Sequence, residues 1–168
     1  MIREATKDDC INLAVLSLQV WLETYAVEGI RTEYSKYVIS TFTESYFLDL
    51  LHNSNYKLLL SEIDDTLQGY ALINLKSCFK DETNGFEIDK LYVHNKFKGR
   101  GIGRSLLYAV EQRYGGRFWL YTWTENTSNK FYQHLGFNQI GKLDIDFNGN
   151  IIENNVYGFN RNITRVHN

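Results

Sequence analysis

Proline is absent from this chain of 168 residues, which also contains two cysteines and one methionine. The cysteines, Cys10 and Cys78, are far apart and lack the spacing of metal ligands, and the four histidines are scattered. A chain with so little cysteine is typical of a reducing compartment. We therefore expect a cytoplasmic protein with no disulfide and no metal site.

The chain also lacks a strong net charge and a long apolar run. Its 18 basic and 20 acidic residues leave a formal charge of −2, whereas nucleic-acid binding needs a basic face. No run approaches the roughly 20 apolar residues of a membrane span, and Arg3 and Glu4 stand where a signal peptide has its apolar stretch. We expect neither a nucleic acid nor a membrane as a partner.

What is present is the composition of a globular protein. Hydrophobic residues make up 43% of the chain and aromatic residues 15%, which excludes disorder and coiled coil. A length of 168 residues fits one domain, at about 100–200 residues per domain. Because no linker or low-complexity tract interrupts the chain, we expect a single domain over residues 1–168.

Hydrophobic periodicity and turn signals predict helices and strands in a mixed order. The expected elements are a strand at Ile2–Ala5, a helix from an N-cap at Thr6 to about Tyr25, one or two weaker helices within Glu28–Asn55, strands at Tyr56–Ile63 and Leu67–Leu75, a strand at Phe86–Val93, a helix at Ile102–Tyr114, a strand at Arg117–Trp123, a helix at Ser128–Leu135 that Gly136 ends, and a hairpin of Phe137–Phe147 and Ile151–Phe159. This order predicts a mixed α+β, or α/β, domain around one central sheet.

The most informative segment is the glycine-rich turn Lys98-Gly99-Arg100-Gly101-Ile102-Gly103-Arg104, between a predicted strand and a predicted helix. Its three glycines let a ligand approach the backbone without meeting Cβ atoms. The first amides of a helix have no internal partners and lie at the positive end of its dipole, where they bind phosphate. From Lys90 to Arg104 there are five basic residues and no acidic one. The turn is either a polyphosphate site or a solvent-facing turn with basic side chains.

Two known phosphate motifs do not fit this turn. A P-loop needs Gly, four residues and then Gly-Lys-Ser or Gly-Lys-Thr, which the chain lacks. A dinucleotide fingerprint that starts at Gly99 and Gly101 needs glycine or alanine where Arg104 stands. A nucleotide-phosphate binder that shares only the glycine turn remains an alternative.

The segment from Leu91 to Leu107 resembles the acetyl-CoA motif of the GNAT superfamily of N-acetyltransferases: Arg or Gln, two residues, Gly, one residue, Gly or Ala. Lys98 stands at the first position, which is a conservative departure. The resemblance implies a GNAT-like fold, with a central mixed and mostly antiparallel sheet flanked by helices, and acetyl-CoA as co-substrate. The residues that it implies for binding acetyl-CoA are Leu91, Tyr92, Val93, Lys98, Gly99, Arg100, Gly101, Ile102, Gly103 and Arg104.

The segment from Asn126 to Phe137 resembles the second motif of that superfamily. The resemblance implies that Asn126 and Tyr132 contact the cofactor and that Tyr132 protonates the leaving sulfur. The spacing from Asn126 to Tyr132 is one residue shorter than the motif has, which leaves the role of Asn126 open. The alternative for Tyr132 is core packing beside Phe131.

Acyl transfer to an amine needs a neutral amine, donors for the developing oxyanion and a proton for the departing thiolate. In the resembling family the amide at the Val93 position binds the acetyl carbonyl, and the same strand often supplies an acid. Glu87 and Asp89 are therefore candidate general bases. A water molecule in that role, or a salt-bridged strand face, is the alternative.

Trp21, Tyr25 and Trp123 occupy regions that border the acceptor cleft in the resembling family, although core packing is an alternative for Trp21. Aromatic walls with Glu87 or Asp89 would suit a cationic amine. We expect direct transfer of an acetyl group to a small-molecule primary amine: a polyamine, an amino sugar or an amino-acid derivative. A protein N-terminus or lysine as acceptor, and a non-catalytic acyl-CoA-binding module, remain open. A homodimer could form through an exposed strand edge of the terminal hairpin.

Overall fold

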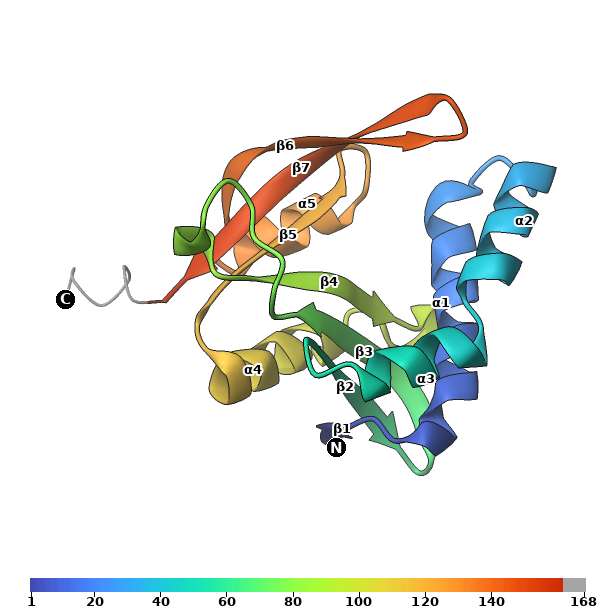
Figure 1. Ribbon diagram of the computed structural model, residues 1–168, viewed down its shortest axis with the longest axis horizontal. Helices are drawn as coiled ribbons and strands as arrows, with labels where there is room; N and C mark the ends of the chain where they lie inside the picture. Colours follow the sequence, from blue (N-terminus) through green and yellow to red (C-terminus); the bar gives the residue numbers. More distant parts are fainter. Residues whose placement is uncertain (162–168) are drawn as a thin grey trace. The chain divides into compact units, whose positions relative to one another are not determined.

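The computed structural model describes residues 1–161, so residues 162–168 of the predicted domain lie outside the described part (Figure 1). The helices and strands are β1 Ile2–Glu4, α1 Cys10–Tyr25, α2 Thr32–Thr41, α3 Glu44–His52, β2 Tyr56–Ile63, β3 Thr66–Asn74, β4 Phe86–Val93, α4 Ile102–Tyr114, β5 Arg117–Trp123, α5 Ser128–His134, β6 Asn138–Phe147 and β7 Asn150–Asn160. The elements follow the predicted order, and the region of weak helical signal contains two helices, α2 and α3.

The strands form one hydrogen-bonded sheet in the order β1-β2-β3-β4-β5-β7-β6. The pairs β1–β2, β2–β3, β5–β7 and β6–β7 are antiparallel, whereas β4 and β5 are parallel. The prediction of a mixed, mostly antiparallel sheet with helices is confirmed. The position of β7 between β5 and β6 did not follow from the sequence.

The chain consists of two compact units, and the boundary between them runs through β4 and α4. Unit 1 contains residues 1–74 and 89–109, and unit 2 contains residues 75–88 and the chain from Val110 onward. The second half of β4 and the glycine turn therefore belong to unit 1. The first half of β4, β5 and α5 belong to unit 2.

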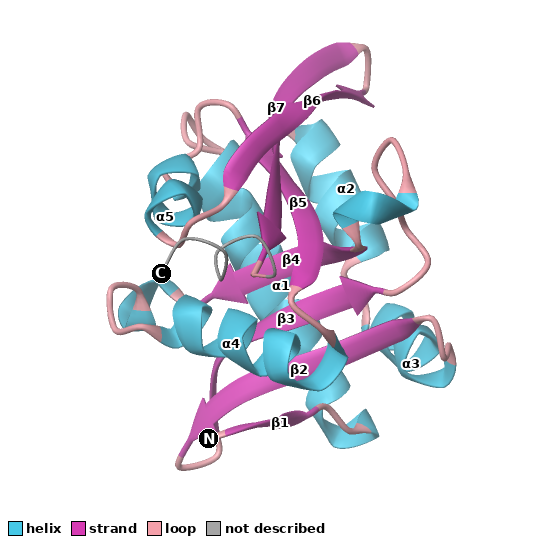
Figure 2. Cartoon of the chain, turned by 90° about the vertical axis from the view of Figure 1, so that its left-hand side faces the viewer, coloured by secondary structure: helices cyan, strands magenta, loops and turns pink. Residues whose placement is uncertain are grey.

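The core of unit 1 lies between the helices α1 and α3 and one face of β2 and β3 (Figure 2). Because side chains alternate along a strand, Leu58 and Leu60 face this core. A buried hydrogen bond links the hydroxyls of Ser17 on α1 and Tyr70 on β3, at 2.6 Å. The side chains that form the core are Cys10, Leu13, Ala14, Leu16, Val20, Phe47, Leu50, Leu58, Leu60, Tyr70 and Leu72.

Helix α1 extends to Tyr25 as the periodicity predicted, but its buried face is not the most apolar one. Ile11 and Val15, which contribute to the apolar repeat, are 50% and 59% exposed, whereas Ser17 is fully buried. Ser17 is tolerated inside because its hydroxyl bonds both Leu13 O and Tyr70. The partners across the core, rather than hydrophobicity alone, therefore set the rotation of α1.

Arg3 joins β1 to two acidic side chains of unit 1: its Nε lies 2.8 Å from Glu62 Oε1 and its Nη1 lies 2.8 Å from Asp9 Oδ2. These hydrogen bonds hold the pKa values of both carboxyls below their ordinary range. A depressed pKa in the folded state stabilises the protein above the unfolded pKa of about 4, and this stability is lost as pH falls through the folded pKa.

We expect Arg3→Met to lower the free energy of unfolding at pH 7 and to lower it less at pH 3, where protonated carboxyls no longer favour the arginine. Urea unfolding of both proteins from pH 3 to pH 7 measures this difference. A difference that is the same at both ends of the range would contradict the assigned role of Arg3.

The core of unit 2 is built from aromatic rings on β5, α5, β7 and the turn after α5. The rings of Phe118 and Phe159 are stacked with centroids 5.1 Å apart, and Phe137 lies 5.2 Å from Phe159. The predicted terminal hairpin is formed by β6 and β7, and its turn has positive φ angles at Asn148 and Gly149, which an Asn-Gly pair favours.

Candidate functional site

The glycine turn of unit 1 is open to solvent. Gly99 and Gly101 have φ angles of +76° and +80°, and a Cβ atom built on either would meet nothing within 4 Å. The carbonyl of Gly101 accepts a hydrogen bond from Ser105 N at 3.0 Å, which closes the first turn of α4. Glycine is needed here for its left-handed backbone, and the space that a side chain would fill is available to a ligand.

The turn presents donors of the kind that bind phosphate. The first amides of α4, after Gly101, have no intrahelical acceptors and lie at the positive end of the helix dipole. The side chains of Lys98, Arg100 and Arg104 are exposed around them. Phe97 is 9% exposed and anchors the turn, with the Arg100 guanidinium 5.7 Å from its ring centroid. This arrangement can hold a diphosphate group.

The end of β4 directs its backbone groups to two edges. His94 N donates to Gln68 O on β3 at 2.9 Å. Because hydrogen-bonding groups alternate along a strand, the amides of Val93 and Leu91 point to the opposite edge. The register of β4 with β5 covers Phe86 and Glu87, so it ends well before Val93. The Val93 amide is thus directed to an edge where a ligand can bind in place of a strand.

Gly69 on β3 makes the close approach of β3 to the end of β4 possible. A Cβ atom at Gly69 would lie 2.6 Å from Tyr92 O and 3.2 Å from Val93 Cγ2. A glycine inside a strand pattern is the sequence signal for such an approach. Gly69 was not among the predicted site residues.

The two candidate bases of β4 belong to different units. Glu87 in unit 2 is 7% exposed and pairs with Trp119 in the parallel register with β5. Asp89 in unit 1 is 27% exposed, and its Oδ1 accepts a hydrogen bond from Lys90 Nζ at 2.8 Å. Asp89 is therefore already engaged by a cation.

Tyr132 lies on α5 in unit 2 with 7% of its surface exposed. Its ring packs 5.4 Å from Phe137 and 6.0 Å from Tyr157. Burial raises the pKa of Tyr132 well above its ordinary value, so the phenol stays protonated at neutral pH. The residue is therefore part of the core and carries a neutral hydroxyl, and its role as a proton donor stays a prediction.

Asn126 has a local role: its Oδ1 accepts a hydrogen bond from Ser128 N at 3.0 Å at the start of α5. Asn129, which the sequence analysis did not single out, holds the turn between β5 and α5. Its Nδ2 donates to Trp123 O and Asn126 O at 3.0 and 2.6 Å, and its Oδ1 accepts from the Tyr157 hydroxyl at 2.8 Å. Asparagine in a loop signals such backbone bonding, but the sequence alone does not show which carbonyls it reaches.

The predicted acceptor residues are divided between the units. Trp21 is 6% exposed, and its ring contacts Tyr25, Tyr34 and Tyr37 with centroids 4.8, 5.6 and 4.9 Å away. Trp21 is therefore the buried centre of an aromatic cluster, and Tyr25 is a half-buried member of it. Trp123, at the end of β5, is half-buried in unit 2.

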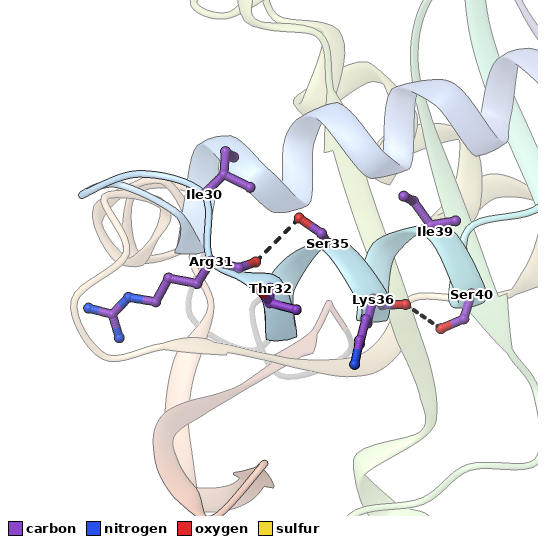
Figure 3. Close-up of a pocket in the computed structure, with 7 residues that line it drawn as sticks. All are labelled: Ile30, Arg31, Thr32, Ser35, Lys36, Ile39 and Ser40. Carbon is purple, nitrogen blue, oxygen red and sulfur yellow. Dashed lines mark hydrogen bonds between the residues drawn. The ribbon is translucent and has the colours of Figure 1, made fainter.

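Unit 1 also has an open groove of about 620 Å³ along α2 (Figure 3). Its two serine hydroxyls are engaged locally, since Ser35 Oγ donates to Arg31 O at 3.3 Å and Ser40 Oγ to Lys36 O at 2.6 Å. None of the predicted site residues lines this groove, and no catalytic set of side chains is directed into it.

The structure corrects the prediction for Lys90, which was counted among the five basic residues around the glycine turn. Lys96, Lys98, Arg100 and Arg104 are exposed, but Lys90 has a side-chain exposure of 18% and is paired with Asp89. Lys90 lies within β4, where side chains alternate between the two faces of the sheet. Its side chain is on the same face as that of Tyr92, which packs against the core of unit 1, and this alternation could have separated Lys90 from the turn.

Across residues 1–161, no helix is long and apolar enough to cross a membrane. The same residues contain no group of three or more His, Cys, Asp or Glu side chains placed to hold a metal ion.

Comparison with known proteins finds a family match over most of the chain. The family model described as "Acetyltransferase (GNAT) family" matches residues 21–137. An uncharacterized N-acetyltransferase encoded in the pepI 3′ region of Lactobacillus delbrueckii subsp. lactis is 21% identical over 150 residues, which covers 84% of this chain and 86% of the relative.

Solved structures of similar fold include two that contain the coenzyme. The PaiA N-acetyltransferase of Thermoplasma acidophilum, in complex with coenzyme A, has a TM-score of 0.72 and 21% identity over 92% of this chain and 96% of its own. An acetyltransferase of Salmonella typhimurium, with acetyl-CoA, has a TM-score of 0.62 and 22% identity over 94% of this chain and 91% of its own. At these identities the likeness is one of fold.

Proposed function

Because the chain belongs to the acetyltransferase (GNAT) family and is therefore an acyltransferase, we propose that it transfers an acetyl group from acetyl-CoA to a primary amine of a small molecule. The observation that carries the proposal is the exposed glycine turn at the start of α4. Its left-handed glycines, free amides and basic side chains fit the diphosphate of coenzyme A. The presence of coenzyme A and acetyl-CoA in the two similar structures supports this choice of ligand.

Acetyl-CoA supplies the acetyl group as a thioester, and the residues of this chain bind and orient it. The amides after Gly101 and the side chains of Lys98 and Arg104 hold the phosphates. The Val93 amide donates a hydrogen bond to the acetyl carbonyl oxygen, where negative charge develops during attack. A positioned backbone donor of this kind lowers the barrier because it needs no reorganisation at the moment of reaction. Leu91, whose amide points to the same edge as that of Val93, extends the backbone edge along which the pantetheine arm lies.

Proton transfer completes the reaction. A lysine-like amine has a pKa of about 10.4, so a base must take its proton before the nitrogen attacks the thioester carbon. We assign this role to Glu87, the carboxylate of β4 that lies six residues before Val93. Asp89 is the second candidate on the same strand. As the C–S bond breaks, the Tyr132 hydroxyl donates its proton to the sulfur.

We expect Glu87→Gln to lower kcat/KM by about 10²–10⁴-fold at pH 7, the usual contribution of a general base. The loss should shrink as pH rises toward the pKa of the amine, because the neutral amine then forms without help. The measurement is thiol release from acetyl-CoA with a panel of primary amines, over pH 6–10.

Asp89→Asn is the matched control for that experiment, since it removes the neighbouring carboxylate of the same strand. A rate that survives in Glu87→Gln and is lost in Asp89→Asn would move the base to Asp89. A protein that neither binds acetyl-CoA nor releases thiol with any amine would overturn the proposed function.

A further inference from the structure

Lys90 is a largely buried cation that uses only part of its hydrogen-bond donors. An ammonium group has three N–H donors. Among residues 1–161, its hydrogen-bond acceptor is Asp89 Oδ1, at 2.8 Å. The side chain remains 18% exposed, so a ligand can reach it. The remaining donors of Lys90 are directed neither to the protein backbone nor to a second carboxylate in the described residues.

Several tyrosines of unit 1 interact electrostatically with this ammonium. Tyr70 on β3 and Tyr92 on β4 have ring centroids 5.6 Å apart, and Tyr46 on α3 packs against the same core. Burial raises the pKa of Tyr25, Tyr46 and Tyr92, and the charge of Lys90 opposes each of these shifts. The phenols are therefore neutral groups, and Asp89 is the charged partner of Lys90.

Tyr25 connects this cluster to an aromatic wall. Its ring lies 4.8 Å from that of Trp21, which also contacts Tyr34 and Tyr37 on α2. Burial raises the pKa of Tyr25, and the charge of Lys90 opposes this shift. Since Trp21 is buried, a small molecule can contact this cluster at the half-buried ring of Tyr25, with a polar end toward the ammonium. Lys90 is also three residues before Val93, whose amide the proposed function places at the acetyl carbonyl.

We propose that Lys90 is a specificity-determining residue that binds a carboxylate or phosphate group carried by the acceptor amine. The inference rests on the proposed function, because it names the class of acceptor for that reaction. The unused donors of Lys90 gain an oxyanion partner when such an amine binds. A polyamine carries no acceptor for these donors, and its further cations would compete with Lys90 for Asp89, the carboxylate that Lys90 already binds. Of the acceptors considered from the sequence, the amino-acid derivative fits best.

The first test compares amines that differ only in the oxyanion: phenylalanine with phenethylamine, and phosphoethanolamine with ethanolamine, with spermidine as the polycation. For the wild type we expect kcat/KM to be about 10–100-fold higher for the oxyanion-bearing member of a pair, the effect of one charge-assisted hydrogen bond. The two pairs distinguish a carboxylate from a phosphate. Lys90→Met should remove the preference through KM, Lys90→Arg should retain part of it, and the exposed control Lys7→Met should leave it unchanged.

The second test needs no turnover. In protein labelled with ¹³C at the lysine ε-carbons, the Lys90 signal is assigned by its loss in Lys90→Met. With coenzyme A present, that signal should shift saturably on addition of phenylalanine or phosphoethanolamine, and not on addition of phenethylamine, ethanolamine or spermidine. A Lys90 signal that moves with neither oxyanion-bearing amine, or that moves equally with both members of a pair, overturns the inference.

The two proposals fail in different ways. If acetyl-CoA does not raise the melting temperature, the proposed function is wrong. If acetyl-CoA binds and the wild type prefers spermidine or phenethylamine, the enzyme assignment stands and only the role of Lys90 is overturned.

Discussion

Tyr132→Phe is expected to lower kcat by about 10²–10⁴-fold, the range for loss of a general acid, and to leave the affinity for acetyl-CoA unchanged. The substitution removes one hydroxyl and retains the ring that packs against Phe137 and Tyr157. A departing thiolate has a pKa of about 8.5, so at neutral pH it gains from a proton donor. Burial raises the pKa of Tyr132, so this donor stays protonated across the physiological range.

Steady-state thiol release and the melting temperature with and without acetyl-CoA measure these effects together. The control is Tyr108→Phe, since Tyr108 is 55% exposed on α4. An unchanged kcat in Tyr132→Phe would leave Tyr132 with its packing role alone. A large fall in the melting temperature without acetyl-CoA would show that the hydroxyl is needed for folding.

Gly101→Val is expected to abolish the stabilisation by acetyl-CoA. At a concentration of 100 times Kd, a ligand that binds only the folded state adds about 2.7 kcal/mol, which the wild type should show as a rise in melting temperature. Valine at a φ of +80° is strained, and its side chain would occupy the open space above the turn. The phosphates then cannot approach the amides of α4.

Gly149→Val is a matched control, because Gly149 has a φ of +84° and also has nothing within 4 Å of its Cβ position. It lies in the β6–β7 hairpin of unit 2, far along the chain from the glycine turn. Both variants should lose stability from backbone strain, but Gly149→Val should retain the rise with acetyl-CoA. Gly101→Ala separates the effect of a small side chain from that of a branched one. A full rise in Gly101→Val would contradict the assignment of the turn.

The sequence determined the order of the elements and the position of the glycine turn. Both depend on local chemistry: hydrophobic period, turn residues and the need for glycine at left-handed positions such as Gly99 and Gly101. The resemblance over Leu91–Leu107 led to the family that the comparison then showed. The assignments of Tyr132, Glu87, Asp89 and Trp123 to the reaction stay predictions.

Only the tertiary structure decided which side chains share an environment. The pattern of α1 predicted a helix but did not show that Ser17 is buried and Val15 exposed, because Tyr70 on a distant strand supplies the partner. In the sequence, Lys90 is one more basic residue near the turn. Only the packing of the chain separates it from the exposed ones and pairs it with Asp89. The hydrophobic period and the spacing of turn residues specify the backbone conformation of each segment. The burial of a side chain and its hydrogen-bond or ion-pair partner depend on how the whole chain packs when the core forms.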